Sequence, residues 1–233
     1  MPRKSVRDLL VFFGLTVFIV AHFWLQNYPD TEFFLTLTVL SLFIIVLLKH
    51  YHKDREFPFD FDENLTAEKW GWIILCAIVI YGINYTFSNV IVAAGFTFIT
   101  VPVSAQPMSF VSLQFPTYVN DMLFNITLVA PGEELCKLVT ITVLFLFSAN
   151  YRWISKKGRL YFSVALPVGF WAVLHTYGSP QFVEHPLFVL PAFLSGVVLV
   201  WLLHKTQSIL AAILSHGFHN CFIIVITVFF GGG

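Results

Sequence analysis

The sequence predicts an all-α fold: a polytopic bundle of transmembrane helices with about seven spans, or eight if one short run also crosses. Of its 233 residues, 58% are hydrophobic and only 11% are charged, which leaves too little polar surface to coat a water-soluble globule. Several apolar runs also reach or approach the length of about 20 residues that a helix needs to cross a bilayer. The net charge is zero, so no global field favours nucleic acid as a partner. We therefore treat residues 1–233 as a single integral membrane domain.

The predicted spans follow one another along the whole chain, near residues 9–26, 33–48, 70–89, 121–148, 161–178, 186–203 and 208–230. The stretch 90–103 is apolar but short and ends at Pro102. It fits a re-entrant piece, a continuation of the third helix, or an eighth span. Residues 104–120 combine two prolines with apolar side chains, as an interfacial loop or a mobile flap over a substrate entrance would.

The distribution of Lys and Arg predicts the orientation in the membrane. Basic residues precede the first span and recur in 49–69, in 150–160 and at Lys205, whereas the loops at 27–32, 104–120 and 179–185 carry none. Cytoplasmic loops are enriched in Lys and Arg. The N-terminus is therefore predicted to be cytoplasmic and the C-terminus to lie outside.

Three charged side chains lie well inside the predicted span 121–148: Glu133, Glu134 and Lys137. An ionisable group at mid-bilayer costs at least about 2.5 kcal/mol on insertion scales and usually serves a function. A structural alternative pairs Glu133 with Lys137 at i,i+4, but it leaves Glu134 unpaired. Pro131 and Gly132 come just before the acids, so we expect the helix to break there and a half-helix to begin at the glutamates.

Two other predicted spans carry polar side chains one helical turn apart. Trp171 and His175 lie in one span, and His216, His219 and Asn220 lie in the last. With a rise of about 1.5 Å per residue, the glutamates, His175, His216 and Asn220 all fall in one central slab of the membrane. These groups are therefore predicted to meet in one site.

The residues in this slab resemble three motifs of the CPBP family of intramembrane proteases, which includes the CAAX prenyl endopeptidases and bacteriocin-processing or immunity proteins. The family's Glu-Glu motif resembles APGEELCK, its aromatic-x-x-x-His motif resembles WAVLH, and its His-x-x-x-Asn motif resembles HGFHN. The resemblance covers about residues 121–225, the motif-bearing core, with the motifs in the family's order. One departure is the spacing EExxK in place of EExxxR, which is similar to the PrsW proteases.

The resemblance implies an intramembrane glutamate-type endopeptidase. Glu133 and His175 would hold and deprotonate a water molecule, and His216 and Asn220 would stabilise the oxyanion. Glu134 would orient this network or pair with the lysine. Lys137, Trp171 and His219 are expected to support the site. The expected partners are the lipid bilayer and a membrane-embedded or lipidated peptide or protein substrate, without nucleic acid; prenylated substrates are compatible with this but not specifically indicated.

Two other interpretations use the same residues. Two carboxylates with two or three histidines could hold Zn²⁺ and a water ligand, giving a zinc-dependent membrane protease. A non-enzymatic scaffold or immunity protein could use the polar cluster to bind a partner helix or to relay protons. The preferred interpretation needs no cofactor and no metal.

Overall fold

The computed structural model describes residues 31–51, 59, 64–93, 117–148, 151, 154–176 and 189–230, and its elements are all helical. They are α2 (Thr31–Tyr51), α3 (Ala67–Ala93), α4 (Thr117–Phe124), a π-helical turn η1 (Asn125–Val129), α5 (Ala130–Ser148), α6 (Lys156–Thr176), α8 (Val189–Thr206) and α9 (Ile209–Phe230). The predicted all-α class is confirmed for this part of the chain. The predicted first span at 9–26, residues 94–103 and most of the segment 104–120 lie outside the described residues.

The helices identify an integral membrane protein. Within the described residues, α2, α3, α8 and α9 are long and apolar enough to cross a membrane. Helix α5 holds three charged residues within its 19 residues, and α6 begins with a basic turn. The outward faces carry large apolar side chains such as Phe43, Phe147 and Phe170, as expected where lipid is the solvent. The count of seven or eight spans and the orientation remain predictions.

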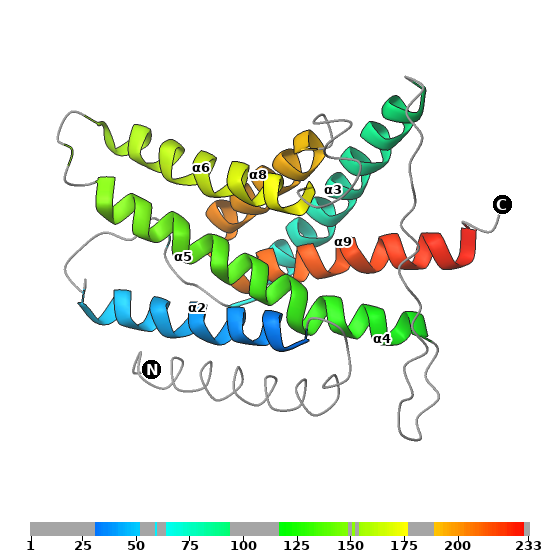
Figure 1. Ribbon diagram of the computed structural model, residues 1–233, viewed down its shortest axis with the longest axis horizontal. Helices are drawn as coiled ribbons and strands as arrows, with labels where there is room; N and C mark the ends of the chain where they lie inside the picture. The colour runs from blue at the N-terminus through cyan, green and yellow to red at the C-terminus, as the bar shows by residue number, and fades with distance from the viewer. Residues whose placement is uncertain are drawn as a thin grey trace.

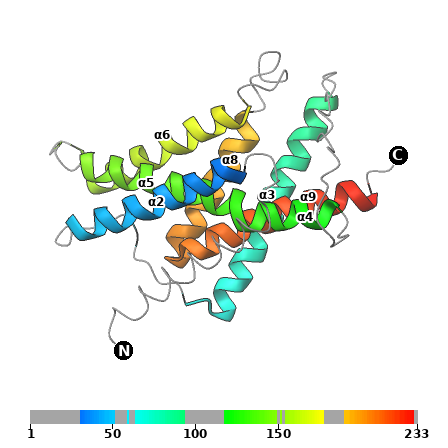
Figure 2. The same ribbon diagram turned by 60° about the horizontal axis from the view of Figure 1, so that its bottom comes forward.

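Helix α5 lies in the middle of the bundle, between α2 and α6, and also packs against α9 (Figure 1). Helix α3 packs against α8 and α9. The view in Figure 2 shows that α3 runs at a steep angle to α5. One buried cluster joins α5, α6, α8 and α9 through Leu138, Val168, Leu203 and Ala212. Helices α6, α8 and α9 are thereby fixed around α5.

The turn between α8 and α9 is short, because α8 ends at Thr206 and α9 begins at Ile209. Ser208 is the N-cap residue of α9, because its Oγ accepts a hydrogen bond from the backbone N–H of Ala211 at 3.1 Å. Gln207 has a positive φ of 54°, the left-handed conformation that commonly ends a helix. Its N–H donates to the carbonyl of Leu203 at 2.8 Å. This turn sets the register of α9, the helix that carries His216 and Asn220.

The predicted break at Pro131 and Gly132 is wrong. Helix α4, η1 and α5 follow one another without interruption, and the turn η1 is closed by the N–H of Ala130 donating to the carbonyl of Asn125. Proline lacks an N–H, and in an α-helix its ring would press against the carbonyl four residues earlier, that of Thr127. The chain meets this demand with a wider π-helical turn directly before the proline, a device often found at functional sites.

Candidate active site

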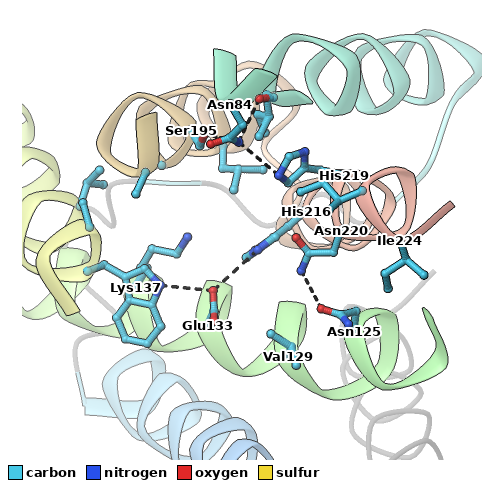
Figure 3. Close-up of a pocket in the computed structure, with 18 residues that line it drawn as sticks. Asn84, Asn125, Val129, Glu133, Lys137, Ser195, His216, His219, Asn220 and Ile224 are labelled. Atoms are coloured by element: carbon cyan, nitrogen blue, oxygen red, sulfur yellow. Dashed lines mark hydrogen bonds and ion pairs between the residues drawn. The ribbon is translucent and has the colours of Figure 1, made fainter. Parts of the chain in front are cut away.

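A cavity of about 400 Å³ lies between the helices, and its polar wall is built from six elements (Figure 3). The polar residues that line it are Asn84, Asn125, Glu133, Lys137, Trp171, Ser195, His216, His219 and Asn220. Aliphatic side chains such as Ile80, Val129 and Leu199 supply much of the remaining lining. A polar wall within an apolar bundle is the typical form of a site that orients a ligand or substrate.

Glu133 is the acid of α5 that lines this cavity. The residue is only 5% exposed, and its Oε2 accepts a hydrogen bond from Nε1 of Trp171 on α6 at 3.3 Å. The same Oε2 lies 3.7 Å from Nε2 of His216 on α9. The carboxylate therefore lies between α6 and α9.

Glu134 has a different environment, and the cavity lining includes Glu133 but not Glu134 among the described residues. Its Oε1 accepts from Nζ of Lys137 at 2.5 Å and lies 2.7 Å from Nδ1 of His216. The sequence-based alternative that leaves Glu134 unpaired is therefore wrong. In a helix, residues at i,i+3 are neighbours as well as those at i,i+4, and here the shorter spacing brings the ammonium to Glu134.

The four ionisable groups Glu133, Glu134, Lys137 and His216 form one connected buried cluster. Nδ1 of His216 faces Oε1 of Glu134 at 2.7 Å, which leaves Nε2 on the side of Glu133 and the cavity.

Asn220 is oriented by a short hydrogen-bond relay. Its Nδ2 donates to Oδ1 of Asn125 at 2.9 Å, and Nδ2 of Asn125 donates to the backbone carbonyl of Asp121 at 2.8 Å. This relay fixes which end of the Asn220 amide carries the nitrogen. Asn125 lies in the π-helical turn η1, so the irregular turn places its amide against α9.

Close packing of α9 against η1 depends on Gly217. A Cβ atom at this position would lie 3.1 Å from Cγ1 and 3.3 Å from Cα of Ile126, tighter than ordinary van der Waals contact. Glycine here lets the helix that carries His216 and Asn220 approach the π-helical turn.

The structure brings together Glu133, Lys137, Trp171, His216, His219 and Asn220 of the predicted site at the cavity, with Glu134 directly behind His216. His175 belongs to the last turn of α6, one turn beyond Trp171, and its side chain lies outside the described residues. The meeting of His175 with Glu133 is therefore still a prediction.

Asn84, Asn125 and Ser195 line the cavity but were missed by the sequence analysis. Each lies in a largely apolar stretch, in GINYT, LFNIT and FLSGV. Asn84 and Asn125 could have been identified from the sequence as candidate site residues, because a carboxamide inside a span needs hydrogen-bond partners. Ser195 could not, because a hydroxyl in a helix often bonds its own backbone.

Among the residues with described side chains, no group of three or more His, Cys, Asp or Glu is arranged to hold a metal ion. The zinc interpretation also draws on His175. It is therefore addressed by the chelator experiment below.

Part of the chain matches a known protein family. Residues 115–222, slightly less than half of the chain, match the family model described as Type II CAAX prenyl endopeptidase Rce1-like. The matched range contains all three sequence motifs and spans α5, α6, α8 and most of α9. No curated protein and no solved structure matches the chain.

Proposed function

We propose that this chain is a glutamate-type endopeptidase that cleaves a membrane-associated or lipidated peptide, because residues 115–222 match the family model of Type II CAAX prenyl endopeptidases. The family is one of endopeptidases, so the predicted enzyme class, a peptide-bond hydrolase, is confirmed at family level. The finer proposal concerns the mechanism and the residues that perform it.

One observation carries the mechanism: the two adjacent glutamates have different surroundings. Glu133 lines the cavity and accepts a hydrogen bond from Trp171. Glu134 is bound to Lys137 and to Nδ1 of His216. An acid that is already paired with an ammonium is a poor proton acceptor. This supports Glu133 as the general base and Glu134 as the group that orients His216.

In the proposed reaction, Glu133 takes a proton from a water molecule as the water oxygen attacks the substrate carbonyl carbon. The negative charge that develops on the carbonyl oxygen is stabilised by Nε2–H of His216 and by the Nδ2–H of Asn220 that does not bond Asn125. Glu133 then gives its proton to the leaving nitrogen as the C–N bond breaks. We propose that His175, one turn beyond Trp171, helps to hold the attacking water.

Hydrogen-bond donors that are fixed before the reaction are effective because they do not need to reorganise as charge develops. Both proposed donors have a fixed orientation: His216 through Glu134 and Asn220 through Asn125. The surrounding apolar helices strengthen these electrostatic interactions, because a medium of low dielectric screens charge less than water does.

The test compares Glu133→Gln with the wild type on purified protein in detergent micelles. The probes are a fluorogenic farnesylated CAAX peptide and its non-lipidated counterpart. Glutamine keeps the shape of glutamate but cannot accept the proton, so cleavage should fall at least about 100-fold. Glu32→Gln, which changes an exposed glutamate at the start of α2, is the matched control and should cleave at the wild-type rate.

The same assay separates the proposal from its two alternatives. A zinc-dependent protease loses activity with a strong chelator and regains it with added zinc, whereas the proposed enzyme keeps its activity. A binding scaffold shows no cleavage in any variant, and partner binding largely survives Glu133→Gln. Cleavage that persists in Glu133→Gln would remove this residue from the mechanism and transfer the role of base to Glu134.

A further inference from the structure

A second polar cluster lines the same cavity, on helices other than the one that carries the glutamates. It consists of Asn84 on α3, Ser195 on α8 and His219 on α9. Figure 3 shows these three side chains grouped together on the side of the cavity away from Glu133. The mechanism proposed above does not use them.

The orientation of the Asn84 amide follows from its contacts. Nδ2 lies 3.0 Å from the carbonyl oxygen of Ile80, a partner that only an N–H group can have. The same nitrogen lies 3.3 Å from Oγ of Ser195 and 3.3 Å from Nε2 of His219. The other end of the amide, Oδ1, accepts no hydrogen bond from the part of the chain that the structure describes. Asn84 therefore presents an open acceptor at the cavity.

Ser195 presents an open donor. Other helical hydroxyls in this chain donate to a carbonyl one turn earlier, as Ser163 does to Arg159 at 2.6 Å and Thr206 does to Leu202 at 2.8 Å. Ser195 makes no such bond within the described residues; it accepts from Asn84 instead. Its hydroxyl proton therefore remains available.

An acceptor and a donor side by side are the complement of a peptide group, which offers one N–H and one C=O. We propose that Asn84 and Ser195 form a subsite that binds the backbone of the peptide in the cavity, on the wall opposite the general base. Oδ1 of Asn84 accepts from a substrate N–H, and the Ser195 hydroxyl donates to a substrate carbonyl. His219 is a positioning residue, which holds the Asn84 amide through Nε2.

The apolar surroundings explain why such a subsite is needed. An extended peptide that leaves water for a membrane-embedded cavity loses the partners of its backbone groups, and each unsatisfied group is costly. A donor–acceptor pair on the wall away from Glu133 offsets this loss and fixes the direction of the peptide. The inference rests on the proposed endopeptidase function and adds the part of the substrate that is recognised, its backbone.

The first test is Ser195→Ala, which removes only the donor. We expect KM for the fluorogenic peptide to rise about 5-fold, the effect of one hydrogen bond, with kcat within 2-fold of the wild type. Ser163→Ala removes the same atom from a hydroxyl that bonds its own helix, and should leave KM unchanged. Thermal unfolding of each variant in detergent checks that the fold is kept.

The second test replaces single substrate peptide bonds by esters, which lack the N–H, at each position within three residues of the cleaved bond. At one position, the ester should weaken wild-type binding about 5-fold and have no effect on Asn84→Ala, because the acceptor is already absent. A merely structural role for Asn84 predicts equal ester effects in both proteins at every position, and that result would overturn the subsite.

Binding is measured separately from cleavage, by fluorescence anisotropy of a labelled peptide with Glu133→Gln protein. If the peptide binds and Ser195→Ala weakens its binding although the wild type does not cleave it, the proposed hydrolysis fails while the subsite stands. If the wild type cleaves and Ser195→Ala changes neither binding nor KM, the subsite fails while the proposed hydrolysis stands. The two proposals are thus distinguishable.

Discussion

Lys137 is the cation that makes two adjacent glutamates tolerable inside the bundle, so Lys137→Met should strongly destabilise the fold. The Nζ–Oε1 separation is 2.5 Å and both residues are 5% exposed. At an effective dielectric constant of about 20, the Coulomb attraction at this distance is about 7 kcal/mol. Desolvation of the two groups offsets part of it. Removing one partner of a buried pair typically costs 3–5 kcal/mol in unfolding free energy, because the other charge is left uncompensated.

The assay is reversible unfolding of the purified protein by SDS in mixed micelles, followed by tryptophan fluorescence. Lys137→Met and Glu134→Gln should each lower the free energy of unfolding by about 3–5 kcal/mol. The double variant removes both charges of the pair, so it should be less destabilised than either single variant. Lys205→Met is the matched control: this lysine is exposed and lies over the Trp72 ring, so it should change stability by no more than about 1 kcal/mol.

Two results would refute this reasoning. One is a loss below about 1 kcal/mol in Lys137→Met, which is the magnitude of an exposed ion pair. The other is a double variant that is less stable than both single variants, which would mean that the two charges do not compensate each other.

Three further predictions concern the donors and the orientation. Asn125→Ala frees the Asn220 amide to turn, so kcat should fall about 10-fold, less than the 10²–10³ that loss of an oxyanion donor costs, with KM nearly unchanged. Gly217→Ala crowds the π-helical turn, and should lower kcat in the same assay while far-UV circular dichroism stays unchanged. In a background without native cysteines, an impermeant thiol reagent applied outside should label a cysteine at 180–184 and spare one in 150–160; the reverse labelling would invert the predicted orientation.

Much of the fold followed from the lengths of the apolar runs. The spans predicted at 33–48, 70–89, 186–203 and 208–230 correspond to helices α2, α3, α8 and α9 within a few residues. Burial in lipid makes hydrophobicity nearly continuous along a span, so each run reports its helix directly.

The π-helical turn was not predictable from Pro131 and Gly132 alone. A proline that cannot be accommodated by regular α-helix has several outcomes, including a break, a kink and a widened turn. Which one occurs depends on the packing of the neighbouring helices, here the contact of Gly217 with Ile126. Local sequence carries no direct information about that contact.

The ion-pair partner of Lys137 also depended on contacts between helices. Spacings of three and four residues both place side chains on one helical face, so the sequence allowed a pair with either glutamate. The position of His216 on α9, which bonds Glu134 through Nδ1, is a tertiary contact. This contact gives Glu133 and Glu134, which are adjacent in the chain, different surroundings.

The π-helical turn also acts as a phase shift between the two parts of a long helix. A π-helical turn contains one residue more than an α-helical turn. This extra residue rotates the helix before it by about 100° relative to the helix after it. The face of α4 and η1 that carries Asn125 is thereby brought round to the same side as the face of α5 that carries Glu133. Deleting one residue in this turn would keep the helix and its hydrophobic length while directing the two groups to different neighbours. Insertions and deletions in this turn are therefore expected to be damaging.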